Sequence, residues 1–150
     1  MEVLPLCSIE MFADRPKARR GAAFLIFDGN EKVNAKTKLS RLKWSVENTF
    51  KTTIEDWADG IETKNPLCHY RRIKIEGKYD CAVFEYKHHR LYGFFCQPKE
   101  GYSLCIFVAY LPMRQWDKEA EICMLCEGFR TSLDVRRAME SIFKEQKNEN

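Results

Sequence analysis

The sequence has no apolar stretch long enough to cross a membrane. Its longest apolar run, LCIFVAYL at 104–111, has the length of a β-strand, whereas a membrane helix needs about 20 apolar residues. The first residues, MEVLPLCSIEMF, lack the basic segment and the long apolar segment of a signal peptide. We therefore expect a soluble cytoplasmic protein with no membrane partner.

The sequence also has little excess charge of either sign. Its 25 basic and 22 acidic residues give a net charge of +3, which does not by itself predict a nucleic-acid partner. The distribution is uneven, because RPKARR at 15–20 holds four basic residues in six and HYRRIKIEGK at 69–78 holds four against one Glu. The segment 15–20 suits either a phosphate backbone or a solvated, flexible arm.

No metal-binding motif accompanies the seven cysteines. Their number is odd, and several lie in apolar runs, where a free Cys behaves as a small hydrophobic residue. Cys123 and Cys126 have CxxC spacing, but their side chains would point to opposite faces of the strand that we expect over 121–129. The sequence therefore predicts free thiols, no metal site and no cofactor.

Hydrophobic periodicity predicts a helical first half. AAFLIF at 22–27 has the length and composition of a strand. Apolar residues recur three or four apart between 30 and 50, which indicates an amphipathic helix, and TTIEDWADG at 52–60 predicts a second, short helix. We expect one domain over 1–150, with 1–20 as a flexible arm and 147–150 as a flexible tail.

After residue 66 the pattern changes to strands, followed by a closing helix from residue 131. In YRRIKI at 70–75, Tyr70, Arg72 and Lys74 alternate with isoleucines and form a basic, aromatic outer face. The other expected strands are 81–87, 90–95, 103–111 and 121–129, of which the last two are apolar on both faces and therefore central. The sum is an α+β fold: an N-terminal strand and two helices packed on a mostly antiparallel sheet, with a C-terminal helix.

The stretch YKHHRLYGFF at 86–95 concentrates basic side chains between two strand segments. If His88 and His89 form a two-residue hairpin loop, Lys87 lies opposite Arg90 and Glu85 lies opposite Tyr92. Like charges directly opposite each other are destabilising, so this register favours a phosphate between the two cations. A four-residue loop would change the pairing, and a purely solvated hairpin tip is the alternative interpretation.

This hairpin face carries the groups that metal-independent RNA cleavage requires. Such cleavage needs a general base for the 2′-hydroxyl, a general acid for the leaving oxygen and cations for the phosphate. Glu85 or a histidine would be the base, Tyr92 or a histidine the acid, and Lys87 and Arg90 would hold the phosphate. Tyr and His side chains also stack on unpaired bases. The candidate catalytic residues are Glu85, Lys87, His88, His89, Arg90 and Tyr92.

Two stretches carry a resemblance to a known family. HRLYGFF at 89–95 is similar to a strand in which an Arg precedes an aromatic run, and EICMLCEGFRTSLDVRRAMESIF at 121–143 is similar to a late strand that ends in a Gly-Phe-basic step before a helix. Together with the helical first half, these stretches make residues from about 22 to 146 resemble the RelE/ParE/HigB toxin superfamily, especially its phage-derived branch.

The resemblance implies an endoribonuclease that cuts mRNA, on the ribosome or free, and is held inactive by an antitoxin protein. Arg90 would match the family's strand arginine, and Arg130, or alternatively Arg114, its late basic position. The candidate RNA-binding residues are Arg72, Lys74, Arg114 and Arg130. Two alternatives remain on the same fold: a non-catalytic RNA- or ribosome-binding module, and a protein-interaction module without an RNA partner.

Overall fold

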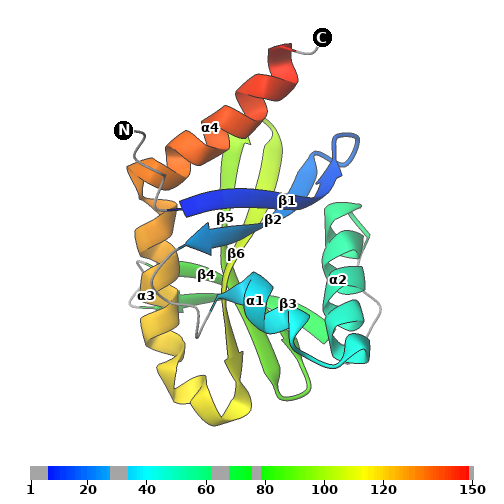
Figure 1. The fold of residues 1–150 in the computed structure, drawn as a ribbon, viewed down its shortest axis with the longest axis vertical. Helices are drawn as coiled ribbons and strands as arrows, with labels where there is room; N and C mark the ends of the chain where they lie inside the picture. Colours follow the sequence, from blue (N-terminus) through cyan, green and yellow to red (C-terminus); the bar gives the residue numbers. More distant parts are fainter. Residues whose placement is uncertain (1–6, 28–33, 62–67, 76–78, 149–150) are drawn as a thin grey trace.

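The computed structural model describes residues 7–27, 34–61, 68–75 and 79–148, with only the backbone at 68–69, 74–75, 79–80 and 144–148. This part of the chain forms a six-stranded sheet with helices on both faces (Figure 1). The elements are β1 (Cys7–Arg15), β2 (Arg20–Phe27), α1 (Ala35–Ser40), α2 (Trp44–Ala58), β3 (Cys68–Ile75), β4 (Tyr79–Tyr86), β5 (His89–Lys99), β6 (Tyr102–Pro112), the 3-10 helix η1 (Met113–Lys118), α3 (Glu119–Arg130) and α4 (Leu133–Asn148).

The strand order in the sheet is β1-β2-β6-β5-β4-β3. All neighbouring strands are antiparallel except β2 and β6, which are parallel. Strand β6 is central and is buried from Leu104 to Leu111, as its apolar composition predicts. The α+β fold class with a mostly antiparallel sheet is confirmed.

Each face of the sheet has its own hydrophobic core. Alternate strand residues such as Val83, Phe94 and Ile106 pack with α3 and α4, while Phe84 and Phe107 pack with α1 and α2. In Figure 1, α3 and α4 (yellow to red) lie on one side of the sheet, and α1 and α2 (cyan to teal) lie on the other. Because successive strand residues point to opposite faces, a residue's place in its strand decides which helices it meets.

Residues 7–15 form a strand of the sheet, and a turn over 16–19 leads to the next strand at Arg20, so our expectation of a flexible arm is wrong for these residues. Residues 1–6 lie outside the described part of the chain. Strand β1 pairs with β2 from Cys7 opposite Phe27 to Arg15 opposite Arg20. Cys7, Ile9 and Met11 do alternate with polar residues, but the register shift between Met11 and Ala13 interrupts this alternation after five residues, as a bulge does.

The segment 121–129 is helical, so the predicted central strand is also wrong. It lies within α3, whose buried residues Ile122, Cys123 and Cys126 recur with helical spacing. A short apolar run does not distinguish a buried strand from a buried helix, and Glu119 and Glu121 in the first turn favour the helix. The two CxxC cysteines therefore share a face and meet Cys81 in the core.

The two N-terminal helices divide at a different point from the predicted one. Helix α1 ends at Ser40, and α2 runs without interruption from Trp44 to Ala58, across the predicted boundary near residue 51. The start of α1 is capped by Asn34, whose side-chain oxygen accepts a hydrogen bond from the backbone N–H of Thr37 at 3.3 Å.

Gly93 tests how closely β5 and β6 approach each other, and Gly128 in α3 provides the control. A Cβ at Gly93 would lie 2.2 Å from the carbonyl oxygen of Ile106, whereas a Cβ at Gly128 in α3 would meet nothing within 4 Å. We expect Gly93→Ala to lower the free energy of unfolding by about 3 kcal/mol, because the backbone must move. Gly128→Ala should raise it by about 0.5–1 kcal/mol. Urea unfolding measures both values, and similar values would contradict the close strand contact.

Candidate functional site

The β4–β5 hairpin has a different register from the predicted one. Tyr86 pairs with His89, so Lys87 and His88 form the loop, and Lys87 takes a left-handed φ of 53°. Arg90 consequently lies opposite Glu85 rather than opposite Lys87. A pair of opposite charges replaces the predicted pair of like charges, and the reason for placing a phosphate between two cations disappears.

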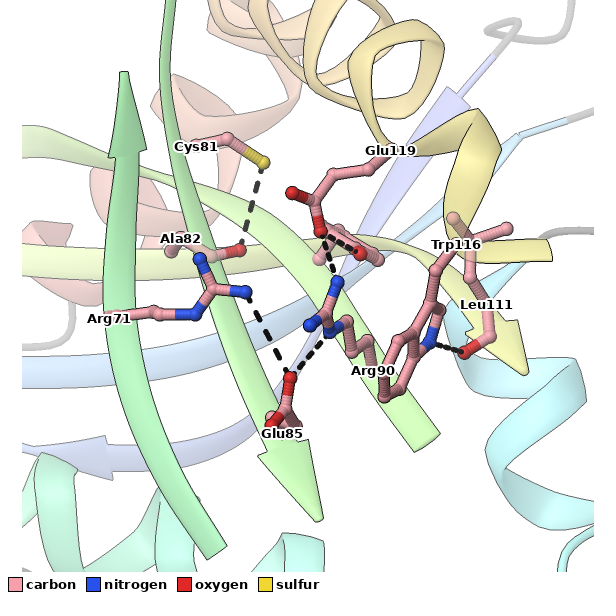
Figure 2. A network of polar contacts seen from close by, with 9 residues as sticks. Arg71, Cys81, Ala82, Glu85, Arg90, Leu111, Trp116 and Glu119 are labelled. Carbon is pink, nitrogen blue, oxygen red and sulfur yellow. Dashed lines mark hydrogen bonds and ion pairs between the residues drawn. The ribbon is translucent and has the colours of Figure 1, made fainter. Parts of the chain in front are cut away.

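Arg90 is enclosed by two carboxylates and an indole ring (Figure 2). Its Nε donates a hydrogen bond to Oε1 of Glu85 at 2.5 Å, and Nη1 donates to Oε2 of Glu119 at 2.8 Å. The guanidinium carbon lies 3.7 Å from the centre of the Trp116 ring. The hydroxyl of Tyr92 donates to the same Oε2 of Glu119 at 2.5 Å. This network joins β4 and β5 to η1 and to the first turn of α3.

Burial decides what the network can do chemically. The Arg90 side chain is 16% exposed, and Tyr92 is fully buried. Burial is the largest single influence and acts to lower the pKa of Arg90, but the hydrogen bonds and charges of Glu85 and Tyr92 together outweigh it and raise the pKa. Burial and then the hydrogen bond to Glu119 raise the pKa of Tyr92 far above its usual range. Arg90 thus stays charged and paired, Tyr92 stays protonated, and the arrangement suits a structural link.

The hairpin tip is a separate cluster. Lys87 and His88 are exposed, while His89 is half-buried with its Nδ1 2.5 Å from the hydroxyl of Tyr110. Burial, and then the positive charges of its two exposed neighbours, lower the pKa of His89. The N–H of Met113 donates to the carbonyl of His88 at 2.9 Å, which joins the tip to η1. Arg114, the next residue in η1, is also exposed and lies at this end of the sheet.

The remaining predicted RNA-binding residues lie in other places. Arg130 is at the last turn of α3, where its Nε donates to Glu127 at 2.8 Å. Lys74 belongs to β3, but its side chain lies outside the part of the chain that the structure describes. Arg72 lines a cavity on the α2 face of the sheet. The predicted residues are therefore divided among several regions instead of sharing one accessible face.

The cavity beside Arg72 has a volume of about 310 Å³ and opens between α2 and the sheet. We call it the arginine-aromatic groove, because two arginines and three aromatic rings dominate its lining. The lining residues are Arg20, Trp57, Tyr70, Arg72, Phe95, Cys96, Gln97 and Ser103.

The charged groups of the groove lie against its rings. The Arg20 guanidinium is 5.1 Å from the centre of the Trp57 ring and donates to the carbonyl oxygen of Trp57 at 2.9 Å. The Arg72 guanidinium is 4.5 Å from the centre of the Phe95 ring, and the Trp57 and Phe95 rings are 5.4 Å apart. Tyr70 meets Phe95 edge to face at 5.7 Å. Two neighbouring rings are thus flanked by two guanidinium groups, which cation–π contacts hold in place.

Only part of this groove was visible in the sequence. The alternation of YRRIKI predicted Tyr70 and Arg72 on one outer face, and the basic segment RPKARR ends at Arg20. Trp57 and Phe95 carried no such signal, because an aromatic residue on a helix or strand is more often part of a core. The groove runs across residues of β2, β6, β5 and β3, and the strand order that places these residues along one face cannot be read from local patterns.

The described residues contain no group of three or more His, Cys, Asp or Glu side chains placed to hold a metal ion. None of the helices in the described ranges is long and apolar enough to span a membrane. No family model, curated protein or solved structure matches the chain. The resemblance to RelE-like toxins therefore stays a prediction.

Removal of Arg90 tests the structural role of its network. Arg90→Ala removes the cation that Glu85 and Glu119 share, and leaves Glu85 with Arg71 at 3.9 Å and Glu119 with the Tyr92 hydroxyl. We expect the free energy of unfolding to fall by about 2–3 kcal/mol, because the ion pairs are only partly buried and a fully buried pair costs more to break. The control is Arg130→Ala, which removes an exposed ion pair and should cost about 0.2–1 kcal/mol. Denaturant unfolding measures both, and a small loss for Arg90→Ala would contradict the role.

The lowered pKa of His89 predicts a pH dependence of stability. The unfolded chain binds a proton near the ordinary pKa of about 6.5, and the folded protein binds it only at lower pH. The stabilisation from neutral His89 is thus present above about pH 6.5 and is lost as the pH falls through the folded pKa. Between about pH 7.5 and 5.5, we expect the Tm of the wild type to fall more than that of His89→Gln. His88→Gln removes one of the neighbouring charges that lower the pKa of His89, so its fall in Tm should lie between those of the wild type and His89→Gln. Identical profiles for all three proteins would refute the assignment.

Proposed function

We propose that this protein binds single-stranded RNA in the arginine-aromatic groove. The supporting observation is the arrangement of Arg20 and Arg72 around the neighbouring rings of Trp57 and Phe95. Proteins grip unpaired nucleotides by stacking bases on aromatic or guanidinium planes and by pairing phosphates with positive charge. Both kinds of group are present within one cavity of about 310 Å³.

The shape of the groove favours a single strand over a duplex. Bases in a duplex are stacked on each other and cannot lie on protein rings, whereas an unpaired base can enter a concave site. Gln97 and Ser103 also line the groove and offer polar groups for base edges or a 2′-hydroxyl. We therefore favour RNA with exposed bases as the ligand.

The same lining favours binding without cleavage. Metal-independent cleavage needs a general base and a general acid, and the described lining holds no carboxylate or imidazole. Burial raises the pKa of Cys96 to about 12, so its thiol stays protonated and unreactive. Arg90 and Tyr92 belong to the opposite face of the sheet, next to α3. Ribonuclease activity and an antitoxin partner thus remain predictions. The activity would have to use the residues of the hairpin tip.

Replacement of Arg72 tests the groove directly. We expect Arg72→Ala to weaken binding of a labelled single-stranded RNA 12-mer, and to reduce the log-log salt slope by about 0.7, the value for one lost phosphate contact. Fluorescence anisotropy between about 50 and 200 mM KCl measures both quantities. Arg114→Ala removes the same charge at the hairpin tip and should leave the affinity unchanged.

Three results would contradict this proposal. If wild-type protein does not bind the 12-mer, the RNA-binding function is wrong and a protein partner becomes the better hypothesis. If Arg114→Ala weakens binding as much as Arg72→Ala, the groove is not the site. If the wild type shortens an end-labelled RNA and a folded His88→Gln/His89→Gln variant does not, the protein is a ribonuclease that acts at the tip.

A further inference from the structure

A second cavity, of about 490 Å³, opens between two hairpin turns at the end of the sheet. One turn connects β1 to β2 and the other connects β5 to β6. We call this space the turn cavity, and its lining residues are Pro16, Arg19, Lys99, Glu100, Gly101 and Tyr102.

The turn cavity and the arginine-aromatic groove share one rim of the sheet. Arg19 and Tyr102 line the turn cavity, and the residues that follow them, Arg20 and Ser103, line the groove. The N–H of Ser103 donates to the carbonyl of Arg19 at 2.9 Å, which closes the rim. Tyr102 and Ser103 are successive residues of β6 and point to opposite faces of the sheet, so the two spaces open on either side of this rim.

The lining of the turn cavity holds two cations, Arg19 and Lys99, and one carboxylate, Glu100. In the described part of the chain neither Arg19 nor Lys99 forms an ion pair, and the Lys99 ammonium lies 5.0 Å from the centre of the Tyr102 ring. The nearby acids are Glu100, which lines the cavity, and Asp14, which accepts a hydrogen bond from the Tyr102 hydroxyl at 2.7 Å. An anion that enters here meets two cations and one exposed carboxylate.

Arg19 holds its position at a conformational cost. Its φ is 57°, in the left-handed region, where a non-glycine residue is disfavoured and a glycine is not. Its side chain lies close to Gly101: a Cβ at Gly101 would be 3.4 Å from Nη1 of Arg19. Lys87 in the β4–β5 turn has a similar φ of 53°, so the left-handed conformation belongs to the turn, and the position of the Arg19 side chain at the cavity is what bears on a ligand.

We infer that the turn cavity is a second phosphate subsite, and that a bound RNA strand crosses the rim from the arginine-aromatic groove to Arg19 and Lys99. This inference rests on the proposed function. Bases would stack on the groove side, and the following phosphates would meet Arg20 and then the two cations of the turn cavity. The ligand at the second subsite is the phosphodiester backbone, so this part of the site reads no sequence.

The test compares a uridine dinucleotide, which fills the groove alone, with a uridine octanucleotide, which spans both spaces. We expect Arg19→Gly to weaken octanucleotide binding roughly tenfold, as for loss of a charge-assisted contact, and to leave dinucleotide binding unchanged. The same variant should have an equal or higher Tm, because glycine relieves the strain. Glu100→Gln should strengthen octanucleotide binding. Calorimetric titration measures all the affinities.

Lys17→Ala is the matched control, because it removes a positive charge from the same turn at an exposed residue outside the cavity lining. An equal loss with Lys17→Ala would show a diffuse charge effect and overturn the subsite. Unchanged octanucleotide binding in both Arg19→Gly and Lys99→Ala would also overturn it, while a loss with Arg72→Ala would leave the proposed function intact. If the wild type binds neither oligonucleotide, both inferences fail together.

Discussion

The guanidinium of Arg90 is the group on which much of this structure depends. A partly buried positive charge is costly unless carboxylates compensate it, and Glu85 and Glu119 do so from two different elements. A slip of one residue in β4 relative to β5 would turn Glu85 to the other face and leave Arg90 with Glu119 alone. The network therefore fixes the hairpin register. Since β3 pairs with β4, it also fixes the face on which Arg72 lies.

The two faces of the sheet use arginine in opposite ways. On the α3 face, two carboxylates neutralise Arg90, and an indole ring covers it. On the α2 face, Arg20 contacts a ring and a carbonyl oxygen, neither of which cancels its positive charge. The charge of Arg90 is neutralised by carboxylates and links elements of the fold, whereas the charge of Arg20 can still attract an anion.

The sequence predicted those features that depend on local composition. The apolar run of β6 predicted a central strand, and the alternation around Tyr70 and Arg72 predicted a basic, aromatic face. The failures have specific physical causes. A bulge cut the alternation of β1 short, a short apolar run in α3 resembled a strand, and a left-handed Lys87 moved the hairpin loop by one residue. The groove could not be predicted because its residues meet only through the order of strands in the sheet.

The parallel pairing of β2 with β6 has a consequence for how the chain folds during synthesis. The β1–β2 hairpin is made first, but the strand that pairs with the other edge of β2 is made only after β5. Until then, the apolar segment from Ala22 to Leu25, buried on both faces in the finished protein, has an open edge and no covering core. Such a segment is prone to pair with other chains. During synthesis the open edge of β2 is therefore exposed to pairing with other chains until β6 has been made and docks against it.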